Sequence, residues 1–503
     1  MIAKICGYTL MGLKGVPISV EVDVNNGLPA FEVVGLADTA VKEAKERVRS
    51  AVKNSGRSMP TRRITANLAP ADVKKEGSAL DLAIAVGVLK SSGQLIADTD
   101  GVVFIGELSL DGSLRRVNGI LPTLISAIGC GYKKFVIPKD NEKEASFVEG
   151  AEVIASQSLS AVIDHLSGLS PLPAVKKHEY KKGELNNIYD SDLALVKGQS
   201  VAKRALEVAV SGGHNLLFVG APGTGKTMLA KCIPTIMPDM SFSEALETTK
   251  IHSVAGLLND ADGIVFTRPF RSPHHTATTV SMTGGGANLK PGEISLAHNG
   301  VLFLDEMPEY TRSTLEALRQ PLEDGCITVS RAVGSVNYPA NFMLCGSMNP
   351  CPCGNYGSQD KVCTCTQSQI SKYKAKLSGP LLDRIDIQVQ VDEVKYCELT
   401  ADEVSESSKT VRDRVNRTRL IQKERFKNDD ISTNADMGEK HLSKYCKLSP
   451  ECEALLKNAY QTLHLSPRAR SRIIKVARTI ADMELYDEIR SEHILEAISY
   501  RHS

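Results

Sequence analysis

"HNLLFVGAPGTGKTMLAKC", residues 214–232, decides the fold of the central part of this 503-residue chain. The apolar run HNLLFV leads into GAPGTGKT (220–227), and the helix-forming KTMLAKC follows directly. The spacing is G-x-x-x-x-G-K-T between a predicted strand and a predicted helix, which is the context that makes this motif specific. Its glycines allow successive backbone N–H groups to point at phosphate oxygens, and the helix amino terminus attracts negative charge. The stretch therefore predicts a phosphate-binding loop.

Each residue of this loop has an expected role. Lys226 is expected to reach the β- and γ-phosphates of a nucleotide, and the hydroxyl of Thr227 is expected to ligate Mg²⁺. The predicted ligands are therefore ATP and Mg²⁺. Contacts with the nucleotide are expected along the whole loop, from Gly220, Ala221, Pro222, Gly223, Thr224, Gly225, Lys226, Thr227 and Met228.

Two further apolar runs end in polar residues that suit phosphate chemistry. GVLFLDE (300–306) ends in Asp305, which would hold Mg²⁺, and in Glu306, which would polarise the attacking water. An acidic pair at the start of a helix would look the same, but its place downstream of the phosphate loop favours catalysis. MLCGSMN (343–349) ends in Asn349, which could orient the water against the γ-phosphate.

Phosphoryl transfer also needs a cation where negative charge develops. Arg384 lies in GPLLDRIDI (379–387), and Arg468 lies at the start of a basic helix in LSPRARSRIIKVARTIADME (465–484). Taken alone, either arginine could equally serve on the surface or in an ion pair. Both are candidates for the catalytic cation.

The composition fits a globular protein of several domains. A chain of 503 residues is long enough for roughly two to four domains, and 42% hydrophobic and 24% charged residues are ordinary values. The formal net charge is +1, so a polyanion site would need a local patch. The best candidate for a membrane span, SALDLAIAVGVL (78–89), contains Asp81 and is too short. The first residues lack a continuous secretory core, so we expect a cytoplasmic protein without a membrane partner.

The pattern along the chain predicts an α/β fold in three parts. Residues 1–168 alternate strands such as VPISVEVDV with helices such as DTAVKEAKERVRSAVKNSG. Residues 169–188 are rich in prolines and lysines and look like a linker. Short apolar strands alternate with helices over 189–395, which is typical of a parallel sheet with crossover helices. Residues 396–503 are nearly all helix-forming and predict a helical lid.

These elements, in this order, resemble the AAA+ ATPases, and within them the branch of magnesium-chelatase motor subunits and MCM-type helicases. Three stretches look most like the YifB/ComM family of chelatase-like ATPases: RALEVAVSGGHNLLFVGAPGTGKT (204–227), FRSPHHTATTVSMTGGGANLKPGEISLAHNGVLFLDE (270–306) and SGPLLDRIDI (378–387). The resemblance covers essentially the whole chain.

The resemblance implies roles for individual residues. Arg384 would match the arginine finger that enters the neighbouring subunit's site, Arg468 the lid arginine called sensor 2, and Asn349 the residue called sensor 1. A catalytic arginine delivered by a neighbour implies a homo-oligomeric ring, and this group is typically hexameric. The residues implied around the adenine are Val196 and Gln199 of VKGQ (196–199), and His214.

Two hairpins are expected to project towards the pore of such a ring. TGGGANLKPGE (283–293) resembles the helix-2 insert of this branch, and a second hairpin is expected within ITVSRAVGSVNYP (327–339). Lys290 and Arg331 are the candidate DNA contacts, because a translocating motor needs cations against phosphates. Solvated loop charges are the open alternative for both residues.

The first part of the chain resembles the proteolytic domain of Lon. The resemblance lies in EGSALDLAIAVGVL (76–89) and in GELSLDGSLRRVNGILPTLISAIGCGYKKFVIPKDNEKEA (106–145). Lon uses a serine nucleophile with a lysine base. Ser78 falls near the serine position, but Leu121 stands where the lysine belongs, and a leucine cannot accept a proton. We therefore expect a domain without proteolytic activity that aids oligomerisation or binds a substrate.

Four cysteines are crowded into NPCPCGNYGSQDKVCTC (349–365), directly after Asn349. The spacing C-x-C-x₉-C-x-C can supply four thiolates to a closed, structural zinc site, although C-x-x-C pairs are more typical. Free reduced thiols and redox pairing remain open alternatives. The candidate ligands are Cys351, Cys353, Cys363 and Cys365.

The function predicted from these features is an ATP-hydrolysing ring motor that acts on branched or single-stranded DNA. A helicase or branch-migration factor in recombination or natural transformation fits best, and its DNA part depends mainly on the family resemblance. A motor subunit for metal insertion into a tetrapyrrole, an ATP-regulated protease and a nucleotide-switched scaffold are the rival interpretations.

Overall fold

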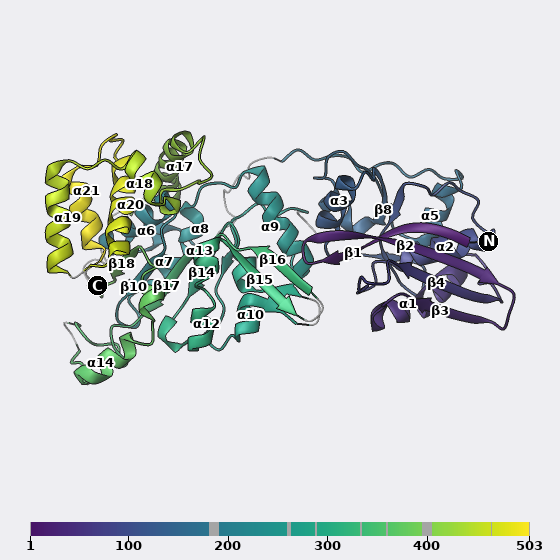
Figure 1. The fold of residues 1–503 in the computed structure, drawn as a ribbon, viewed down its shortest axis with the longest axis horizontal. Coiled ribbons are helices and arrows are strands. Elements are labelled where there is room, and N and C mark those ends of the chain that lie inside the picture. Colours follow the sequence, from purple (N-terminus) through teal and green to yellow (C-terminus); the bar gives the residue numbers. More distant parts are fainter. Residues whose placement is uncertain are drawn as a thin grey trace.

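The chain folds into three parts that follow one another along its longest axis (Figure 1). A computed structural model describes residues 2–180, 191–258, 263–286, 289–331, 334–358, 361–394, 405–463 and 465–501. The front domain (2–168) lies at one end, the core domain (191–394) in the middle and the helical lid (405–501) at the other end. The mixed α/β fold predicted from the sequence is confirmed, and no helix among the described residues is long and apolar enough to cross a membrane.

The front domain is a seven-stranded sheet of mixed direction with helices on both faces. Its strand order is β3-β4-β2-β1-β5-β8-β9, and β1 and β2 form a long antiparallel hairpin. The strands are β1 (Ile2–Met11), β2 (Lys14–Asn25), β3 (Ala30–Val34), β4 (Arg63–Ala69), β5 (Val102–Phe104), β8 (Lys134–Pro138) and β9 (Glu152–Ser156). A separate small pair is formed by β6 (Glu107–Leu108) and β7 (Leu114–Arg115).

The alternation of apolar residues along these strands gives the sheet two buried faces. Ile5 points into one hydrophobic cluster with the helices α1 (Thr39–Asn54), α2 (Asp81–Ser91) and α5 (Leu159–Leu166), whereas Tyr8 points into a second cluster with α3 (Ile120–Gly129) and α4 (Glu142–Ala145). Successive side chains of a strand face opposite sides of the sheet, so Ile5 and Tyr8, at an odd and an even position of β1, enter different clusters. The sheet is therefore covered on both sides.

The core domain has a five-stranded parallel sheet in the order β11-β14-β17-β10-β18. Its three central strands, β14, β17 and β10, are short, apolar and almost wholly buried, as expected for a parallel sheet covered on both faces. The five strands are β10 (Leu216–Val219), β11 (Phe270–Arg271), β14 (Val301–Leu304), β17 (Met343–Met348) and β18 (Ile387–Gln390).

Ten helices of the described residues surround this sheet, and two β-hairpins extend from it. The helices are α6 (Ser200–Gly212), α7 (Lys226–Lys231), α8 (Ile233–Ile236), α9 (Phe242–Ala255), α10 (Thr279–Thr283), α11 (Glu293–Leu296), α12 (Arg312–Glu316), α13 (Pro321–Asp324), α14 (Gln367–Lys374) and α15 (Gly379–Leu382). The hairpins are β12 (Gly284–Gly285) with β13 (Lys290–Pro291), and β15 (Cys326–Arg331) with β16 (Gly334–Pro339).

The lid consists of helices that share one hydrophobic cluster with the core sheet. Ile473 and Ile480 of the lid lie in the same cluster as Phe218 and Phe303 of the sheet. The lid helices are α17 (Ser408–Arg425), α18 (Glu439–Tyr445), α19 (Pro450–Thr462), α20 (Pro467–Met483) and α21 (Ser491–Ser499). Ser466 caps α20 by accepting a hydrogen bond from the Ala469 N–H, and Pro467 occupies its first turn.

The segment expected to be a linker is anchored to both domains by a few side chains, although most of its described residues are exposed. Val175 is 7% exposed in a front-domain cluster, and the Tyr180 hydroxyl donates to the Met240 carbonyl of the core at 3.0 Å. The Tyr180 ring stacks on Phe266, and Phe147 of the front domain joins the same aromatic cluster. Residues 171–180 therefore join the two domains as a strap that is anchored at Val175 and Tyr180, and residues 181–188 of the predicted linker lie outside the described residues.

A second contact between front and core domains is polar. The backbone N–H of Gly119, at the start of α3, donates to the Ser253 hydroxyl of α9 at 3.0 Å, and that hydroxyl donates to the buried carboxylate of Glu144. A third contact is steric, because a Cβ built on Gly12 would lie 2.1 Å from Cγ1 of Val336 in the second hairpin. The first hairpin of the front domain thus packs directly on a hairpin of the core.

Candidate functional site

The predicted phosphate site lies where the parallel strands of the core end. Strands β10, β14 and β17 are neighbours and run in the same direction, so their carboxyl ends meet at one edge of the sheet. The phosphate loop follows β10, Asp305 and Glu306 follow β14, and Asn349 follows β17. Three segments that are far apart in the sequence therefore meet at one place.

The phosphate loop has the backbone that its glycines predict. Gly223 and Gly225 have φ of 84° and 91°, a left-handed region that favours glycine. A Cβ on Gly220 would lie 2.3 Å from the carbonyl oxygen of Val391, so this position also needs the smallest residue. Helix α7 begins at Lys226, directly after the loop, and its amino terminus faces the loop.

Lys226 occupies the centre of this loop. Its ammonium donates to the carbonyl oxygens of Gly220 and Ala221, both at 2.7 Å, and to Oδ1 of Asn349 at 3.3 Å. Burial lowers the pKa of Lys226, while Asp305 and Glu306 act in the opposite direction. The ammonium therefore has a local set of acceptors that phosphate oxygens can replace, and Asn349 lies within its reach.

The acidic pair after β14 is held in place by Ser347, which was not predicted from the sequence. Thr227 donates to Oδ2 of Asp305 at 3.0 Å, and the hydroxyl of Ser347 donates to Oδ1 of the same carboxylate. The backbone N–H of Glu306 donates to the Ser347 hydroxyl at 3.1 Å. Ser347 is fully buried on β17, so it links the strand of Asn349 to both acids.

The oxygen atoms of Thr227 and Asp305 fit a magnesium ion. Mg²⁺ prefers hard oxygen ligands and is usually held in such sites by one or two protein groups together with phosphates and water. A hydroxyl and a carboxylate 3.0 Å apart, next to a phosphate loop, are a donor set that suits this ion. The side chain of Glu306 is exposed beside them, where a water molecule could reach it.

A cavity of about 800 Å³ extends from the first residues of the phosphate loop. Gln199 lines it together with Gly220 and Ala221, and the Gln199 amide donates to the carbonyl oxygens of Thr224 and Asp392. Val196 is 4% exposed and packs in the hydrophobic core, and it is not among the described residues that line the cavity.

His214 is not in this cavity, so its predicted contact with adenine is wrong. It precedes β10, whereas the phosphate loop follows β10, and the strand separates the two. The ring is fully buried, with Nδ1 3.3 Å from Oδ2 of Asp386 and Nε2 2.8 Å from Oγ1 of Thr479 in the lid. His214 therefore connects the core sheet to helix α20.

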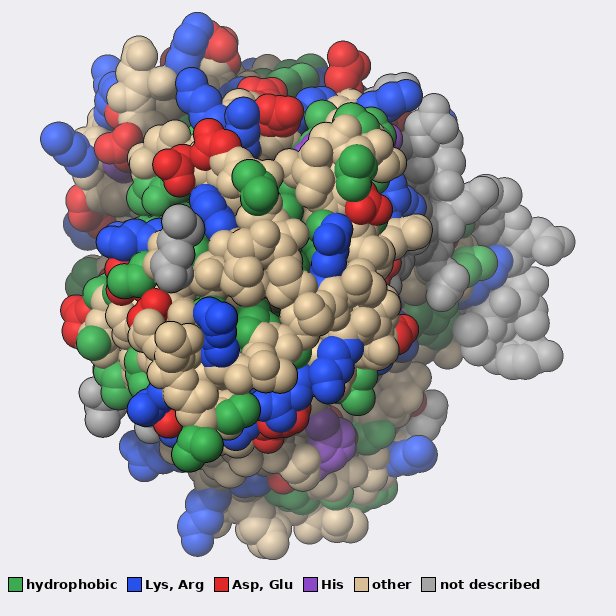
Figure 2. All heavy atoms as spheres, turned by 90° about the vertical axis from the view of Figure 1, so that its right-hand side faces the viewer, with side chains coloured by type: hydrophobic (Ala, Val, Ile, Leu, Met, Phe, Trp, Pro, Cys, Tyr) green, Lys and Arg blue, Asp and Glu red, His purple; other side chains and the backbone are tan. Residues whose placement is uncertain are grey.

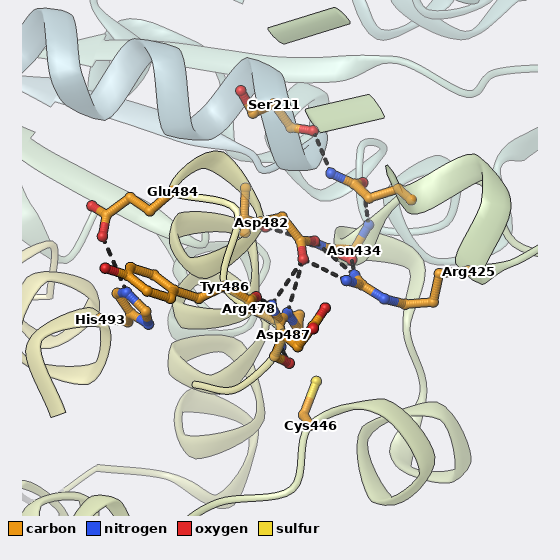
Figure 3. A network of polar contacts seen from close by, with 12 residues as sticks. Ser211, Arg425, Asn434, Cys446, Arg478, Asp482, Glu484, Tyr486, Asp487 and His493 are labelled. Carbon is orange, nitrogen blue, oxygen red and sulfur yellow. Dashed lines mark hydrogen bonds and ion pairs between the residues drawn. The ribbon is translucent and has the colours of Figure 1, made fainter. Parts of the chain in front are cut away.

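This connection continues into a buried polar network of the lid (Figure 3). Asn434 donates to Thr479 at 3.1 Å and to the carboxylate of Asp482 at 2.8 Å. Asp482 also accepts from the guanidinium groups of Arg478 and Arg425, and Figure 3 shows these side chains converging on it. The lid is thereby tied to the start of β10 by hydrogen bonds as well as by apolar packing.

Arg384 and Arg468 lie together, away from the phosphate loop of their own chain. Arg384 precedes β18, which pairs in parallel with β10, so it lies at the edge of the sheet opposite to the loop. Both arginines line a cavity of about 760 Å³ between core and lid, and no residue of 220–228 is among its described lining residues. Within one chain, the predicted catalytic cations and the phosphate loop do not meet.

Arg384 has a partner that the sequence did not reveal. Its guanidinium donates to the carbonyl oxygen of Pro380 at 2.7 Å and forms an ion pair with Glu323 of α13. The bond to Arg384 lowers the pKa of Glu323, so the carboxylate stays ionised. The arginine side chain is 11% exposed, and the ion pair holds it in a defined position.

The four clustered cysteines converge in space. The Sγ atom of Cys351 lies 3.3 Å from that of Cys353 and 3.7 Å from that of Cys363, and the two latter atoms are 3.6 Å apart. The Sγ atom of Cys365 joins them, with all four within 4.8 Å of one another. Four sulfurs bound to zinc at about 2.3 Å would be spaced about 3.8 Å apart, so the donor set fits this ion.

The two predicted hairpins are present, and a hydrogen bond connects one to the other. The hydroxyl of Tyr338 in β16 donates to the carbonyl oxygen of Leu289 at 2.6 Å, beside the first hairpin. Lys290 follows Leu289 and is exposed. Arg331 ends β15 next to the turn of the second hairpin, but its side chain lies outside the described residues.

The front domain places Ser78 beside a carboxylate and Leu121 in a buried helix. The Ser78 hydroxyl donates to the carboxylate of Glu107. Leu121 is 1% exposed in α3, and its backbone N–H donates to Glu144 at 2.9 Å. The nearby Lys75 is fully buried and donates to the carbonyl oxygen of Pro70.

Comparisons with known proteins match the three parts of the chain. The family model "Magnesium chelatase, subunit ChlI" matches residues 192–399, "Subunit ChlI of Mg-chelatase" matches residues 20–141, and "Magnesium chelatase, subunit ChlI C-terminal" matches residues 405–501. A shorter similarity, 28% identity over 98 residues, links 19% of this chain to 18% of Lon protease 2 of Bacillus subtilis (strain 168).

Two relatives match over almost their whole length. The chain is 44% identical over 497 residues to the uncharacterized protein YifB of Escherichia coli (strain K12), which covers 98% of this chain and 95% of that protein. It is 43% identical over 500 residues to the competence protein ComM of Haemophilus influenzae, covering 98% of this chain and 96% of that protein. The chain therefore belongs to the YifB/ComM family of magnesium-chelatase-like AAA+ ATPases.

Proposed function

We propose that this protein is a cytoplasmic ATP-hydrolysing ring motor that acts on DNA. The observation that supports the ring is the separation of Arg384 and Arg468 from the phosphate loop of the same chain. Each chain offers a phosphate loop at one edge of its core sheet and two arginines at the opposite edge. A head-to-tail contact between copies would bring the two together, and such a heterologous contact generates a ring when its rotation closes; the family resemblance leads us to propose a hexamer.

In this arrangement, each side chain of the phosphate site has one task. Lys226 exchanges its carbonyl acceptors for the β- and γ-phosphate oxygens, and Asn349 together with Glu306 orients the attacking water. Mg²⁺, held by Thr227 and Asp305, would neutralise phosphate charge when bound. The neighbour's Arg384 stabilises the charge that develops on the γ-phosphate, and Arg468 approaches from the same side.

Mixing two inactive variants tests this division of the site. Lys226→Ala removes the loop lysine and Arg384→Ala removes the finger, so we expect each variant alone to hydrolyse ATP very slowly. In an equal mixture, roughly a quarter of the interfaces combine an intact loop with an intact finger, and ATPase activity should return to about that level. Activity that stays at the level of the single variants, in rings shown to exchange subunits, would contradict a shared site.

The DNA part of the proposal is supported by the hairpins and by one relative. The relative from Haemophilus influenzae carries the name competence protein, which fits a role in natural transformation and recombination. Lys290 and Arg331 lie on hairpins that the core domain holds together through Tyr338. The front-domain end, in contrast, shows basic and acidic side chains interspersed (Figure 2), so we place the contact with branched or single-stranded DNA at the hairpins.

Particle size and turnover test the DNA proposal together. Glu306→Gln should trap ATP, and we expect this variant to form rings on forked DNA with ATP, measured by light scattering or mass photometry.

The ATPase activity of the wild type should rise with forked DNA. Lys290→Ala should weaken this stimulation, whereas Lys423→Ala, at an exposed lysine of the lid, should not. Stimulation by a porphyrin with chelatase partner subunits, and not by DNA, would favour the tetrapyrrole alternative.

We also propose that Cys351, Cys353, Cys363 and Cys365 hold a structural Zn²⁺. The sulfur spacings of 3.3–3.7 Å support this, since they are close to the edge of a zinc–thiolate tetrahedron. Backbone N–H groups, first that of Asn355 and then that of Thr364, lower the pKa of Cys353 to about 6, whereas the pKa values of Cys363 and Cys365 are raised, so a bound metal would have to displace the protons of those two thiols. Metal analysis should find one zinc per chain in the wild type and none in Cys363→Ser, and a metal-free wild type with free thiols would reject the site.

A further inference from the structure

The cysteine segment touches the phosphate loop. We call residues 351–358 and 361–365 the cysteine knuckle, and it begins only two residues after Asn349. A Cβ built on Gly354 would lie 2.5 Å from Cδ and 2.8 Å from Cγ of Pro222, so backbone of the knuckle packs directly on the ring of that proline. Gly354 lies between the two cysteine pairs, and its N–H donates to the carbonyl oxygen of Cys351 at 3.0 Å. The cysteines therefore fix the part of the chain that supports the phosphate loop.

The knuckle also forms one wall of the cavity beside this loop. Tyr356, Gly357 and Ser358 line the 800 Å³ cavity from the knuckle, and Gln199 and Ala221 line it from the other side. Tyr356 is 46% exposed, which leaves much of its ring available to a ligand. Lys374, in the last turn of the helix that follows the knuckle, lines the same cavity.

The position of this cavity indicates which part of a nucleotide it takes. Its described lining includes the start of the phosphate loop but none of Lys226, Thr227 and Asp305, which lie on the side of the γ-phosphate and Mg²⁺. The cavity therefore extends from the phosphates towards the base and ribose. An aromatic ring in such a place can stack on a base of any kind, since every base has a π face.

We propose that the cysteine knuckle is a wall of the nucleotide site, that Tyr356 is a further nucleotide-binding residue at the base, and that metal binding to the four cysteines sets nucleotide affinity. The inference rests on the proposed ATP site. Pro222 couples the knuckle to the phosphate loop, and Tyr356 couples it to the base. Loss of the metal frees Gly354 from Pro222 and removes the ring from the base at the same time.

Two glycines with left-handed backbone offer a test of the contact with Pro222. Gly354 has φ of 82° and Gly131, in the front domain, has φ of 93°, so alanine strains the backbone at both places. Only at Gly354 does the added Cβ meet another group, because a Cβ on Gly131 would have no heavy atom within 4 Å. We expect Gly354→Ala to weaken binding of a fluorescent ATP analogue about tenfold more than Gly131→Ala, with zinc content unchanged in both. Equal affinities in the two variants would refute the contact.

Tyr356 is tested with ligands that do and do not carry a base. Tyr356→Ala should weaken ATP and ADP binding about tenfold, the size of one stacking contact, and Tyr356→Phe should bind like the wild type. Inorganic pyrophosphate, which lacks a base, should bind the wild type and Tyr356→Ala equally well. Tyr460→Ala, at a lid tyrosine 39% exposed, is the control. Unchanged ATP affinity in Tyr356→Ala would overturn this role.

Removal of the metal tests the coupling itself. We expect wild type treated with a mercurial and a chelator to bind both ATP and pyrophosphate at least about tenfold more weakly, and zinc to restore both affinities. Circular dichroism and particle size report whether the rest of the fold survives the treatment. Full ATP affinity without the metal would refute the inference while leaving the ATP site intact, whereas a wild type that never binds ATP would refute the proposed function instead.

Discussion

At the scale of single residues, the most informative side chain is Ser347, which has no predicted contact with nucleotide or metal but holds residues that do. Ser347 is fully buried, donates to Asp305 and accepts from the backbone of Glu306. It is a positioning residue, because it fixes the carboxylate that would face Mg²⁺ and the backbone of the residue that would orient water. Groups that orient metal ligands in this way typically contribute ten- to hundredfold to activity, as an order of magnitude.

We expect Ser347→Ala to lower kcat for ATP about 10- to 100-fold and to raise the Mg²⁺ concentration needed for half-maximal activity, with ATP binding retained. A merely structural role would not shift the Mg²⁺ dependence. Ser295→Ala is the control, because Ser295 is also fully buried but its hydroxyl has no hydrogen-bond partner in the described chain. Equal Mg²⁺ curves for the wild type and Ser347→Ala would contradict the positioning role.

Arg384 is a second residue whose removal should reduce ATP turnover while leaving ATP binding largely unchanged. If its guanidinium serves the neighbouring subunit, Arg384→Ala should leave ATP affinity within about threefold and reduce turnover about 10³-fold or more. Arg384→Lys keeps the charge but loses the planar fork, so it should recover only part of the rate. Equilibrium binding and steady-state hydrolysis measure the two quantities, and a loss of affinity without a loss of kcat would assign this arginine a different role.

At the scale of elements, helix α20 joins the lid to the core. It supplies Thr479 to His214 and carries Asp482, whose carboxylate is 1% exposed and accepts from two guanidinium groups (Figure 3). A buried ion pair adds little by its presence, but removing one partner leaves uncompensated charge inside the protein. The helix therefore depends on Asp482 more than on any exposed charge of the lid.

Asp482→Ala should lower the free energy of unfolding by about 3–5 kcal/mol, because the guanidinium groups of Arg478 and Arg425 lose their buried acceptor. Urea denaturation followed by circular dichroism measures this change. Glu424→Gln breaks an ion pair with Lys427 whose side chains are 80% and 70% exposed, and it should leave the urea midpoint nearly unchanged. Similar midpoint shifts in the two variants would show that the network is not what stabilises the lid.

At the scale of the whole molecule, the front domain is attached to the core at several places. The strap with Tyr180, the contact of Gly119 with Ser253 and the packing of Gly12 on Val336 come from different parts of the front domain. Contacts spread over an interface resist rotation better than a single linker would. The front domain should therefore unfold together with the core.

Calorimetry tests this coupling. We expect the wild type to show one joint thermal transition for front and core domains, and Tyr180→Ala to split it, because the variant loses the stack on Phe266 and the bond to the Met240 carbonyl. Tyr460→Ala, on the lid and far from the strap, should keep the joint transition. Two separate transitions already in the wild type would contradict the coupling.

The sequence predicted the parts of this site that lie next to strong local patterns. Lys226, Asp305 and Asn349 each follow an apolar strand, and parallel strands bring their carboxyl ends together. The prediction for His214 was wrong because strand β10 lies between it and the phosphate loop. The five residues that separate them are extended, so the two positions lie at opposite ends of the strand although they are close in sequence. Ser347 and Glu323 could not be predicted, since their partners depend on strand order and on a contact 61 residues along the chain.

The ion pair of Arg384 with Glu323 bears on the order in which nucleotide binding and ring closure take place. In a lone subunit the guanidinium of Arg384 is already paired with the carboxylate of Glu323, so this arginine has to leave one anion in order to reach another. A bound triphosphate adds several negative charges to the neighbouring site, so a loaded neighbour favours the exchange of Glu323 for phosphate as the partner of Arg384. On the proposed ring, nucleotide loading thus comes before closure, and a spent site lets the finger return to its resting acceptor.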